Sequence, residues 1–342
     1  MADSIRHSHR PTVALTTLKQ RAALLETVRQ FFQQRGYLEV ETPLLSGDVC
    51  IDAWLDPFIL REKPSAGAPE EPMFLQTSPE FAMKRLLAAG CNAIYQVTRS
   101  FRKGEIGPLH NPEFTIVEWY RVGDEITQQM SLVEELVRAT LETAAGLERR
   151  ERAGLLPERI PRLTYDEAFS RFAGEPVLRA SCRQLRNLAR RKGVAAPAGL
   201  ATDDRDGWLN LLLTALVEPK LSELPAVFLT DYPATQAALA RVREGDPPVA
   251  ERFELYLRGI EICNGYQELT DPVELKNRML RQADLRRAAG ASKLPVDSRL
   301  LAAMQEGLPE CAGVALGFDR LVMWCLNAHH IRDVIAFPFD RA

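Results

Sequence analysis

The sequence predicts an α+β fold, in which strands are combined with helices and residues 126–250 form an insertion or a helical layer. Three observations predict this class. Residues 93–121 have the pattern of a strand, a charged loop and a second strand. Residues 311–324 follow as a strand that leads into a helix, and residues 126–216 show helical periodicity between these two stretches. With 342 residues, the chain is long enough for one large domain or two.

Composition narrows the classes of function. The chain is 46% hydrophobic and 26% charged, which is typical of a globular protein. Its net charge of −3 gives no overall basic field that draws it to nucleic acid. No apolar run approaches the about 20 residues of a membrane span, and the N-terminus lacks the apolar core of a signal peptide. The six cysteines are scattered without a C-x-x-C pair, which favours free thiols in a cytoplasmic protein over a zinc site.

The first element is an amphipathic helix. Thr17 and Gln20 have capping-box spacing, apolar residues then recur at helical intervals, and Gly36 ends the helix. Residues 37–42 alternate as a strand that Pro43 stops. This apolar surface fits either core packing or a subunit interface, and nothing local separates the two.

A second helix begins after a polar, proline-rich excursion at 61–73, which predicts a mobile surface loop. Ser78 is a suitable N-cap, Pro79 a suitable first helical residue, and Gly90 a suitable terminator. Glu80 then lies in the first turn, where a carboxylate could bind a substrate amine. Taken alone, capping also explains these residues.

The stretch at 99–121 carries most of the chemistry. Alternation places Glu118 and Tyr120 on one strand face with two large apolar residues, which suits a cationic ligand. The loop before that strand carries Arg102 and Lys103, groups suited to polyphosphate or carboxylate. We interpret the stretch as a nucleotide and amine site; the alternative is an ordinary hairpin with a charged tip.

In the region from 126 to 250, the sequence pattern predicts helices and a strand but no functional site. Its arginines fit solvated helix faces better than a nucleic-acid site. The predicted elements are helices at 126–145, 165–172, 182–192 and 208–216 and a short strand at 227–230.

Two later stretches suggest ligands for phosphate. In residues 253–263, interpreted as one strand, Glu261 is the only charge on its face and needs a cationic partner. A turn at Asn264-Gly265 could bring Glu268 to Glu261, and two carboxylates with a polyphosphate can hold Mg²⁺; a salt bridge to an arginine is the alternative. Further on, Gly317 lets a flat ligand approach the backbone, and Arg320 could clamp a phosphate.

Together these stretches resemble the catalytic domain of class II aminoacyl-tRNA synthetases, specifically the lysyl type, from about Leu18 to the C-terminus. The helix, strand and Pro43 are similar to motif 1, which builds the dimer interface in that family. SFRKGEIGPLHNPEFTIVEWY resembles motif 2, GVALGFDRL resembles motif 3, and GIEICNGYQELTD resembles the lysyl-specific metal and substrate segment. The resemblance implies a class II synthetase-like antiparallel sheet flanked by helices, with the helical insertion between motifs 2 and 3.

Two differences from the lysyl-tRNA synthetases narrow the resemblance to a subgroup of the family. Fewer than about 20 residues precede motif 1, too few for an anticodon-binding barrel. We therefore expect a flexible tail at 1–15, one catalytic domain at 16–342 and no anticodon-dependent tRNA binding. Motif 3 also has Ala315 where the synthetases have glycine. Both features resemble the paralogues that modify elongation factor P, and a methyl group at 315 could favour a β-amino over an α-amino substrate.

The resemblance implies that lysine, preferably (R)-β-lysine, reacts with ATP to give an adenylate, and that the acyl group passes to a lysine ε-amine of elongation factor P. It implies a homodimer and Mg²⁺ held by Glu261 and Glu268. Arg102 is expected at the α-phosphate and the substrate carboxylate, and Arg320 at the γ-phosphate. The other residues expected at ATP are Lys103, Gly104, His110, Asn111, Glu261, Ile262 and Gly317. Those expected at the amino-acid substrate are Ser78, Pro79, Glu80, Glu118, Tyr120 and Glu268.

One mismatch concerns adenine. The family usually has Arg-x-Glu in motif 2, whereas this chain has Glu105 one residue further on, after Gly104. Either the Gly104 backbone or a displaced Glu105 could contact the base. Two other hypotheses stay open: a truncated lysyl-tRNA synthetase and a non-catalytic sensor of lysine or ATP.

Overall fold

The computed structural model describes residues 9–52, 54–62, 71–148 and 155–342. The chain divides into two compact units, each described here by itself. Unit 1 comprises residues 1–152 and 270–342, and unit 2 comprises residues 153–269. Both units combine helices with mostly antiparallel strands, so the α+β prediction is confirmed.

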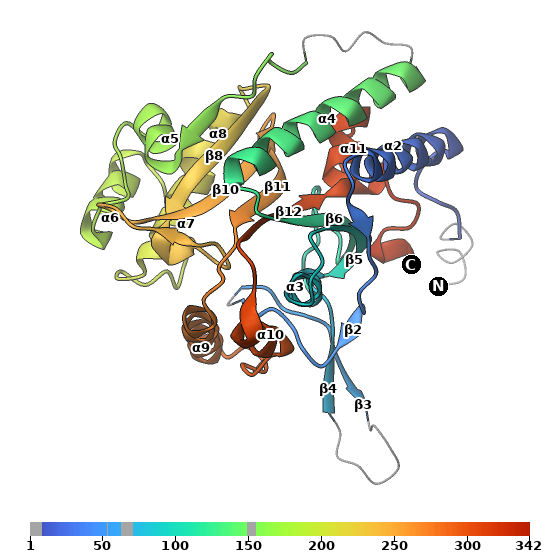
Figure 1. The fold of residues 1–342 in the computed structure, drawn as a ribbon. Helices are drawn as coiled ribbons and strands as arrows, with labels where there is room; N and C mark the ends of the chain where they lie inside the picture. The colour runs from blue at the N-terminus through green and yellow to red at the C-terminus, as the bar shows by residue number, and fades with distance from the viewer. Residues whose placement is uncertain (1–8, 53, 63–70, 149–154) are drawn as a thin grey trace. The chain divides into compact units, whose positions relative to one another are not determined.

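Unit 1 contains a sheet with the strand order β1-β5-β6-β12 (Figure 1). β5 and β12 both pair antiparallel with β6, whereas β1 runs parallel to β5. Their bounds are Leu38–Glu39 for β1, Ala93–Phe101 for β5, Glu113–Val122 for β6 and Cys311–Gly317 for β12. A smaller antiparallel sheet has the order β2-β4-β3, with β2 at Leu45–Ser46, β3 at Ile59–Glu62 and β4 at Glu71–Leu75.

The helices of unit 1 cover this sheet. α2 and α4 lie side by side (Figure 1), and Phe32 of α2 packs its ring 4.7 Å from that of Tyr95 and 5.0 Å from that of Trp119. All three side chains are almost fully buried. The helices are α2 at Leu15–Gln34, α3 at Glu80–Ala88, α4 at Ile126–Glu148, α9 at Pro272–Ala288, α10 at Arg299–Gly307 and α11 at Phe318–Leu326; short 3₁₀ turns span Ile331–Asp333 and Phe339–Arg341.

The N-terminal predictions need correction in their boundaries. α2 begins at Leu15, and its N-cap, Ala14, makes no side-chain hydrogen bond, so the capping box at Thr17 is wrong. Gly36 has φ +75°, as expected for a residue that ends a helix. The strand predicted over 37–42 shrinks to β1, because only two residues there pair with β5.

Two predicted flexible segments are partly described. Residues 61–62 belong to β3 and residues 71–73 to β4, so both ends of the predicted loop are paired strand; residues 63–70 lie outside the described residues. Of the predicted tail, residues 1–8 also lie outside them. At its described end, Thr12 donates its amide to Ala336 O at 2.9 Å.

Unit 2 contains the strand order β11-β10-β8-β7, with β9 also paired to β10. Capping boxes at Thr164 and Ser181 begin α5 and α6, two of the helices that the periodicity predicts. The strands are β7 at Arg162–Thr164, β8 at Ala226–Pro233, β9 at Val242–Arg243, β10 at Val249–Leu257 and β11 at Ile260–Gln267. The helices are α5 at Tyr165–Phe172, α6 at Cys182–Arg191, α7 at Arg205–Leu212, a π-helical turn at Leu213–Val217, α8 at Glu218–Leu221 and a 3₁₀ turn at Ala234–Gln236.

Within the described part of the chain, no helix is both long and apolar enough to cross a membrane.

Candidate active site

The loop between β5 and β6 is closed by its own backbone. The Arg102 amide donates to Pro112 O at 2.9 Å, and Gly107 and His110 exchange two amide hydrogen bonds of 3.1 and 3.2 Å. Gly104 adopts φ +85°, a conformation that a side chain would strain. The strand, charged loop and strand predicted here are confirmed, and we name residues 102–112 the nucleotide loop.

Arg102 begins the nucleotide loop with its guanidinium 5.0 Å from the centre of the Phe114 ring and 3.7 Å from the Glu105 carboxylate. The displaced acidic residue of motif 2 therefore lies beside Arg102. Lys103 and Gly104 are exposed, and the Lys103 amide donates to Asp56 O at 2.8 Å.

Arg320, in the first turn of α11, lies against the same loop. Its Nη2 is 2.7 Å from His110 Nε2, and its Nε donates to Leu109 O at 3.4 Å. Desolvation, followed by the Arg320 charge, lowers the pKa of His110, so the neutral imidazole is favoured. Gly317 immediately precedes this helix as its N-cap. Two residues predicted to contact ATP, His110 and Arg320, are thus in direct contact.

The Asn111 side chain hydrogen-bonds to two backbone groups of the protein. Its Nδ2 donates to Glu113 O at 2.6 Å, and its Oδ1 accepts from the Phe339 amide at 2.9 Å. These bonds tie the end of the nucleotide loop to the C-terminal turn. A contact between Asn111 and ATP stays a prediction.

A second group of predicted residues forms what we call the amine cluster: Ser78, Glu80, Lys84, Glu118 and Tyr120. Glu118 accepts from Ser78 Oγ at 2.8 Å and from the Tyr120 hydroxyl at 2.5 Å. Lys84 Nζ donates to Glu80 Oε1 at 2.5 Å. The two predicted substrate subsites, Ser78 with Glu80 and Glu118 with Tyr120, are therefore hydrogen-bonded to one another.

The start of α3 brings Ser78 to this cluster. The helix begins at Glu80 with Pro79 as its N-cap, one residue later than predicted. Ser78 Oγ accepts from the Glu80 amide at 3.0 Å while donating to Glu118. Ser78 is therefore not the N-cap that the sequence predicted, although its hydroxyl bonds both the first helical amide and the Glu118 carboxylate; its contact with a substrate stays a prediction.

The charge state of Glu118 is set by burial. Only 1% of this residue is exposed. Desolvation, and next the negative charge of Glu80, raise the pKa of Glu118 to about 8, although the two hydroxyl donors and Lys84 act in the opposite direction. This raised pKa favours the protonated form of Glu118 at neutral pH. A cation placed there from outside would displace that proton.

Ala315 lies beside this carboxylate. In the register of β12 and β6, Ala315 is the direct partner of Glu118, and directly paired residues project from the same face of a sheet. Gln96 of β5 is the partner on the other side. A methyl group at 315 therefore borders the amine cluster.

In unit 2, the stretch that carries Glu261 is a hairpin and not one strand. β10 ends at Leu257, the chain turns at Arg258 and Gly259 with positive φ at both, and β11 begins at Ile260. A Cβ at Gly259 would lie 2.9 Å from Ser222 Cβ, so only glycine fits.

The predicted turn at Asn264-Gly265 is wrong, because both residues pair with β10 inside β11. A β-bulge lies nearer the hairpin: Cys263 faces Leu255 and Glu261 faces Tyr256, which leaves Ile262 as an extra residue. The bulge shifts Glu261 to the face of Tyr256 and Glu254. Glu261 is therefore not the only charge on its face, contrary to prediction.

The bulge also decides whether Glu261 shares a face with Glu268, which follows β11. An odd separation of seven residues would place Glu261 and Glu268 on opposite faces of a regular strand. The extra residue restores the same face for both. Glu268 and Ile262 are each 1% exposed. Among the described residues, no group of three or more histidine, cysteine, aspartate or glutamate side chains is arranged to hold a metal ion, so a site here depends on these two carboxylates and on ligand oxygens.

Sequence reasoning missed several buried charges of unit 1, among them Lys84 and Asp319. Lys84 is 2% exposed, and its one signal was the i,i+4 spacing from Glu80. Asp319, beside Arg320, accepts from the Thr115 amide at 2.7 Å and pairs with Arg21 at 2.5 Å. That contact joins α2, β6 and α11 and had no local signal.

Comparison with known proteins agrees with these features. The family model described as tRNA synthetases class II (D, K and N) matches residues 5–341. Proteins called elongation factor P–(R)-β-lysine ligase are similar along almost their whole length. The one from Vibrio cholerae is 42% identical over 97% of this chain and 98% of its own, and the one from Pectobacterium atrosepticum is 42% identical over 98% of both. The Salmonella arizonae protein of the same name is 41% identical over 97% of this chain and 98% of its own.

Proposed function

This chain belongs to the class II tRNA synthetase family, and we propose that it is an ATP-dependent ligase that attaches lysine, preferably (R)-β-lysine, to elongation factor P. The observation that carries the proposal is the buried amine cluster bordered by Ala315. A buried carboxyl group that can exchange its proton for a cation, held by two hydroxyl donors, is suited to a substrate ammonium, and the methyl group of Ala315 borders the same site.

The reaction has two steps. A carboxylate oxygen of the substrate attacks the α-phosphorus of ATP, the bond to the β-phosphate oxygen breaks, and pyrophosphate leaves. The neutral ε-amine of the acceptor lysine then attacks the acyl carbon, an amide forms, and AMP leaves with the loss of a proton from the amine. Positioning and charge stabilisation carry such a displacement, so no covalent enzyme intermediate is required.

We assign Arg102 to the α-phosphate and the substrate carboxylate, and Arg320 to the γ-phosphate. His110, Asn111, Lys103, Gly104, Gly317 and Ile262 are proposed to line the ATP site. A guanidinium that stays charged at all working pH values suits both phosphate roles. The neutral imidazole of His110 leaves the Arg320 charge uncontested by a second cation.

Mg²⁺ fits the two carboxylates of unit 2. Glu261 and Glu268 project from one face because of the bulge at Ile262, and carboxylate oxygens are ligands that Mg²⁺ prefers. When bound, the ion would neutralise phosphate charge. We propose these two residues as its protein ligands.

The remaining proposals concern assembly and compartment. Leu15, Leu38 and Leu45, on α2 and the strands that follow it, are 73%, 58% and 40% exposed, which supports a homodimer built on this segment. All six cysteines are free thiols, which supports a reducing, cytoplasmic compartment. Residues 16–342 are proposed to act as one catalytic domain.

The test is the mass of elongation factor P after incubation with the enzyme, ATP, Mg²⁺ and each lysine isomer. We expect the mass of one lysyl group to be added, with (R)-β-lysine the better substrate, and no acylation of lysine-specific tRNA. Arg102→Ala should abolish adenylate formation while the protein stays folded, whereas Arg99→Ala, on the exposed side of β5, should not. If tRNA is acylated while elongation factor P stays unmodified, the protein is a tRNA synthetase instead. If neither lysine isomer supports pyrophosphate exchange, the result supports a sensor.

A further inference from the structure

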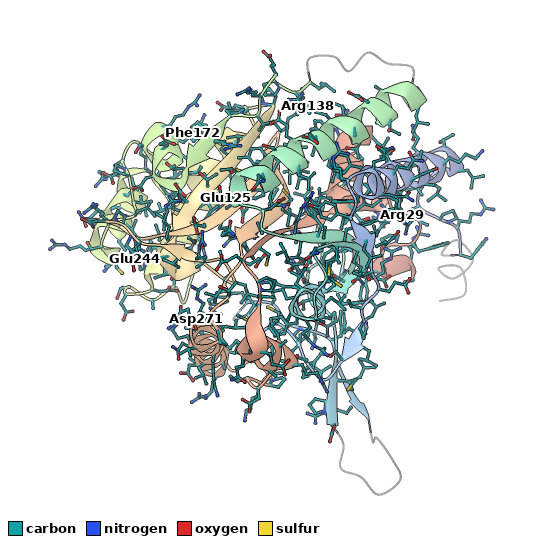
Figure 2. All side chains as sticks on the ribbon, in the orientation of Figure 1. Arg29, Glu125, Arg138, Phe172, Glu244 and Asp271 are labelled. Atoms are coloured by element: carbon teal, nitrogen blue, oxygen red, sulfur yellow. The ribbon has the colours of Figure 1, made fainter. Side chains whose placement is uncertain are left out.

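Arg286, near the C-terminal end of α9, is a buried cation outside the site described above. Its side chain is 2% exposed. α9 begins at Pro272, directly after its N-cap Asp271, which Figure 2 labels. The Asp271 carboxylate accepts from the Val273 and Glu274 amides. A buried guanidinium is costly unless its donors are matched, so its partners show what it holds.

Four donors of Arg286 are used, and three of them reach a segment more than 200 residues away. Nη1 donates to Asp52 O at 2.9 Å and to Leu55 O at 3.0 Å, and Nη2 pairs with Asp56 Oδ1 at 2.5 Å. Nε donates to Ser292 O at 3.1 Å, just beyond α9. The planar fork therefore fixes both the backbone and a side chain of this segment relative to α9.

The clamped segment is also held from within. Asp52 Oδ1 accepts from the Trp54 amide at 2.7 Å and from the Leu55 amide at 3.1 Å. These bonds form a turn of the kind that aspartate side chains favour. Because the turn and Arg286 hold the segment from two sides, the Asp56 carbonyl has a defined position.

That carbonyl accepts from the Lys103 amide at 2.8 Å, directly after Arg102. On the other side of Arg102, its own amide donates to Pro112 O at 2.9 Å. The amides on either side of the Arg102 Cα are thus each held by a hydrogen bond, and Arg102 O also accepts from the Glu105 amide at 3.5 Å. One of those bonds ends, through Asp56, on Arg286.

We propose that Arg286 is a positioning residue for the nucleotide loop: by clamping Asp52, Leu55 and Asp56, it fixes the Lys103 amide and so the direction in which Arg102 projects. The inference rests on the proposed role of Arg102 at ATP. It adds a residue that lies more than 170 positions from the loop in the sequence.

The test compares Arg286→Met and Arg286→Lys with Arg287→Met in the full-length protein. Arg287 is the neighbour on the same helix, is 79% exposed and pairs within the helix with Asp284, so it is a matched control. The first measurement is hydrogen exchange of amides 101–107 in the absence of any substrate. We expect Arg286→Met to speed exchange of the Lys103 amide, and Arg287→Met to leave it unchanged.

The second measurement separates positioning from general stability. In lysine-dependent pyrophosphate exchange, Arg286→Met should raise the KM for ATP or lower kcat/KM for ATP by about 10- to 100-fold, with the KM for lysine unchanged. Arg286→Lys keeps the positive charge but not the planar guanidinium, so its KM for ATP should lie between those of the wild type and Arg286→Met. Asp56→Asn, at a side chain that is 53% exposed and tolerant of change, should show a smaller shift of the same kind.

The outcomes separate the two proposals. Unchanged exchange at Lys103 in folded Arg286→Met and Asp56→Asn proteins overturns the positioning role. So does a lower active fraction with an unchanged KM for ATP, because that is the result of lost stability alone. Wild-type protein that protects Lys103 but performs no pyrophosphate exchange would overturn the proposed function and leave the clamp intact.

Discussion

Two buried carboxylates, Glu118 in unit 1 and Glu254 in unit 2, make similar hydrogen bonds but have different charged neighbours. Glu254 pairs directly with an arginine, whereas Glu118 lies near a second carboxylate, Glu80. Glu118 and Glu254 each accept from two hydroxyl groups, and they are 1% and 6% exposed. Glu118 accepts from Ser78 and Tyr120, at 2.8 and 2.5 Å. A hydroxyl donor is therefore common to both and does not distinguish a ligand site from a structural one.

Glu254 is neutralised by its own strand. Its hydroxyl donors are Tyr232 at 2.6 Å and Tyr256 at 2.7 Å, and Arg252, two residues away on β10, pairs with it at 2.5 Å. The Arg252 guanidinium also lies 4.4 Å from the centre of the Tyr232 ring. The Glu254 carboxylate thus has a fixed cation and two hydroxyl donors from the protein itself.

Around Glu118 the named charges do not balance. Glu80 adds a second carboxylate, and the Lys84 ammonium contacts Glu80 at 2.5 Å. A proton on Glu118 makes up the difference, and a proton can be exchanged for a substrate ammonium. The comparison teaches that a structural carboxylate is balanced by a fixed cation, whereas a ligand site is balanced by something that can leave.

The largest expected effects come from replacing each carboxylate with an amide. Glu254→Gln leaves the Arg252 charge, only 17% exposed, without its carboxylate and should lower the free energy of unfolding by up to about 3 kcal/mol. Glu118→Gln resembles the protonated carboxyl and should leave stability at neutral pH nearly unchanged, but raise the KM for lysine by about 100-fold or more. Denaturant unfolding and pyrophosphate exchange on both variants measure this. If Glu118→Gln unfolds and Glu254→Gln loses only lysine binding, the assignment of the two sites is reversed.

A smaller effect is expected in the pH dependence of stability. The pKa of Glu118 in the folded protein, about 8, lies above its ordinary value of 4.5. The folded state therefore binds more protons than the unfolded state between these values. The contribution of Glu118 to the free energy of unfolding is full below the lower value and is lost as pH rises through the upper one, on the order of a few kcal/mol in total.

Melting curves of the wild type and Glu118→Gln across this range isolate that contribution. The stability of the wild type should fall relative to that of the variant up to about pH 8 and then stay level. Parallel curves for the two proteins would show that Glu118 does not hold a proton in the empty cluster.

The smallest expected effect is on substrate binding. If a substrate ammonium displaces the Glu118 proton, lysine affinity should rise by up to about tenfold per pH unit below pH 8 and level off above it. Titration calorimetry in two buffers of different ionisation enthalpy should show release of up to one proton per site at neutral pH. Binding without proton release would place the ammonium on Glu80 instead.

Much of the site could be predicted because its signals are local. Alternation in 113–121 placed Glu118 and Tyr120 on one face, and the structure joins them by a hydrogen bond. Proline and glycine punctuation marked the nucleotide loop, and Gly317 marked the change from strand to helix. These features depend on spacings of two to four residues, which backbone geometry fixes wherever the segment lies.

The acidic stretch of unit 2 shows where local signals fail. Asn264-Gly265 is the stronger turn signal, yet the chain turns at Arg258-Gly259, where Ser222 leaves no space for a Cβ. Which of these two glycine-containing dipeptides forms the turn depends on the partner strand and its register. The bulge at Ile262, which returns Glu261 to the face of Glu268, is likewise a property of pairing with β10.

The sequence by itself determined the local patterns that mark the candidate residues and the order of the elements that hold them, since periodicity and turn residues act within a few positions. Only the tertiary structure decided which charges are buried together. Lys84 and Arg286 look in the sequence like any solvated lysine or arginine, yet both are buried. Arg252, beside Glu254, is likewise only 17% exposed. Burial and long-range partners distinguish them, because a charge is costly only where water is excluded, and that depends on segments far apart in the chain.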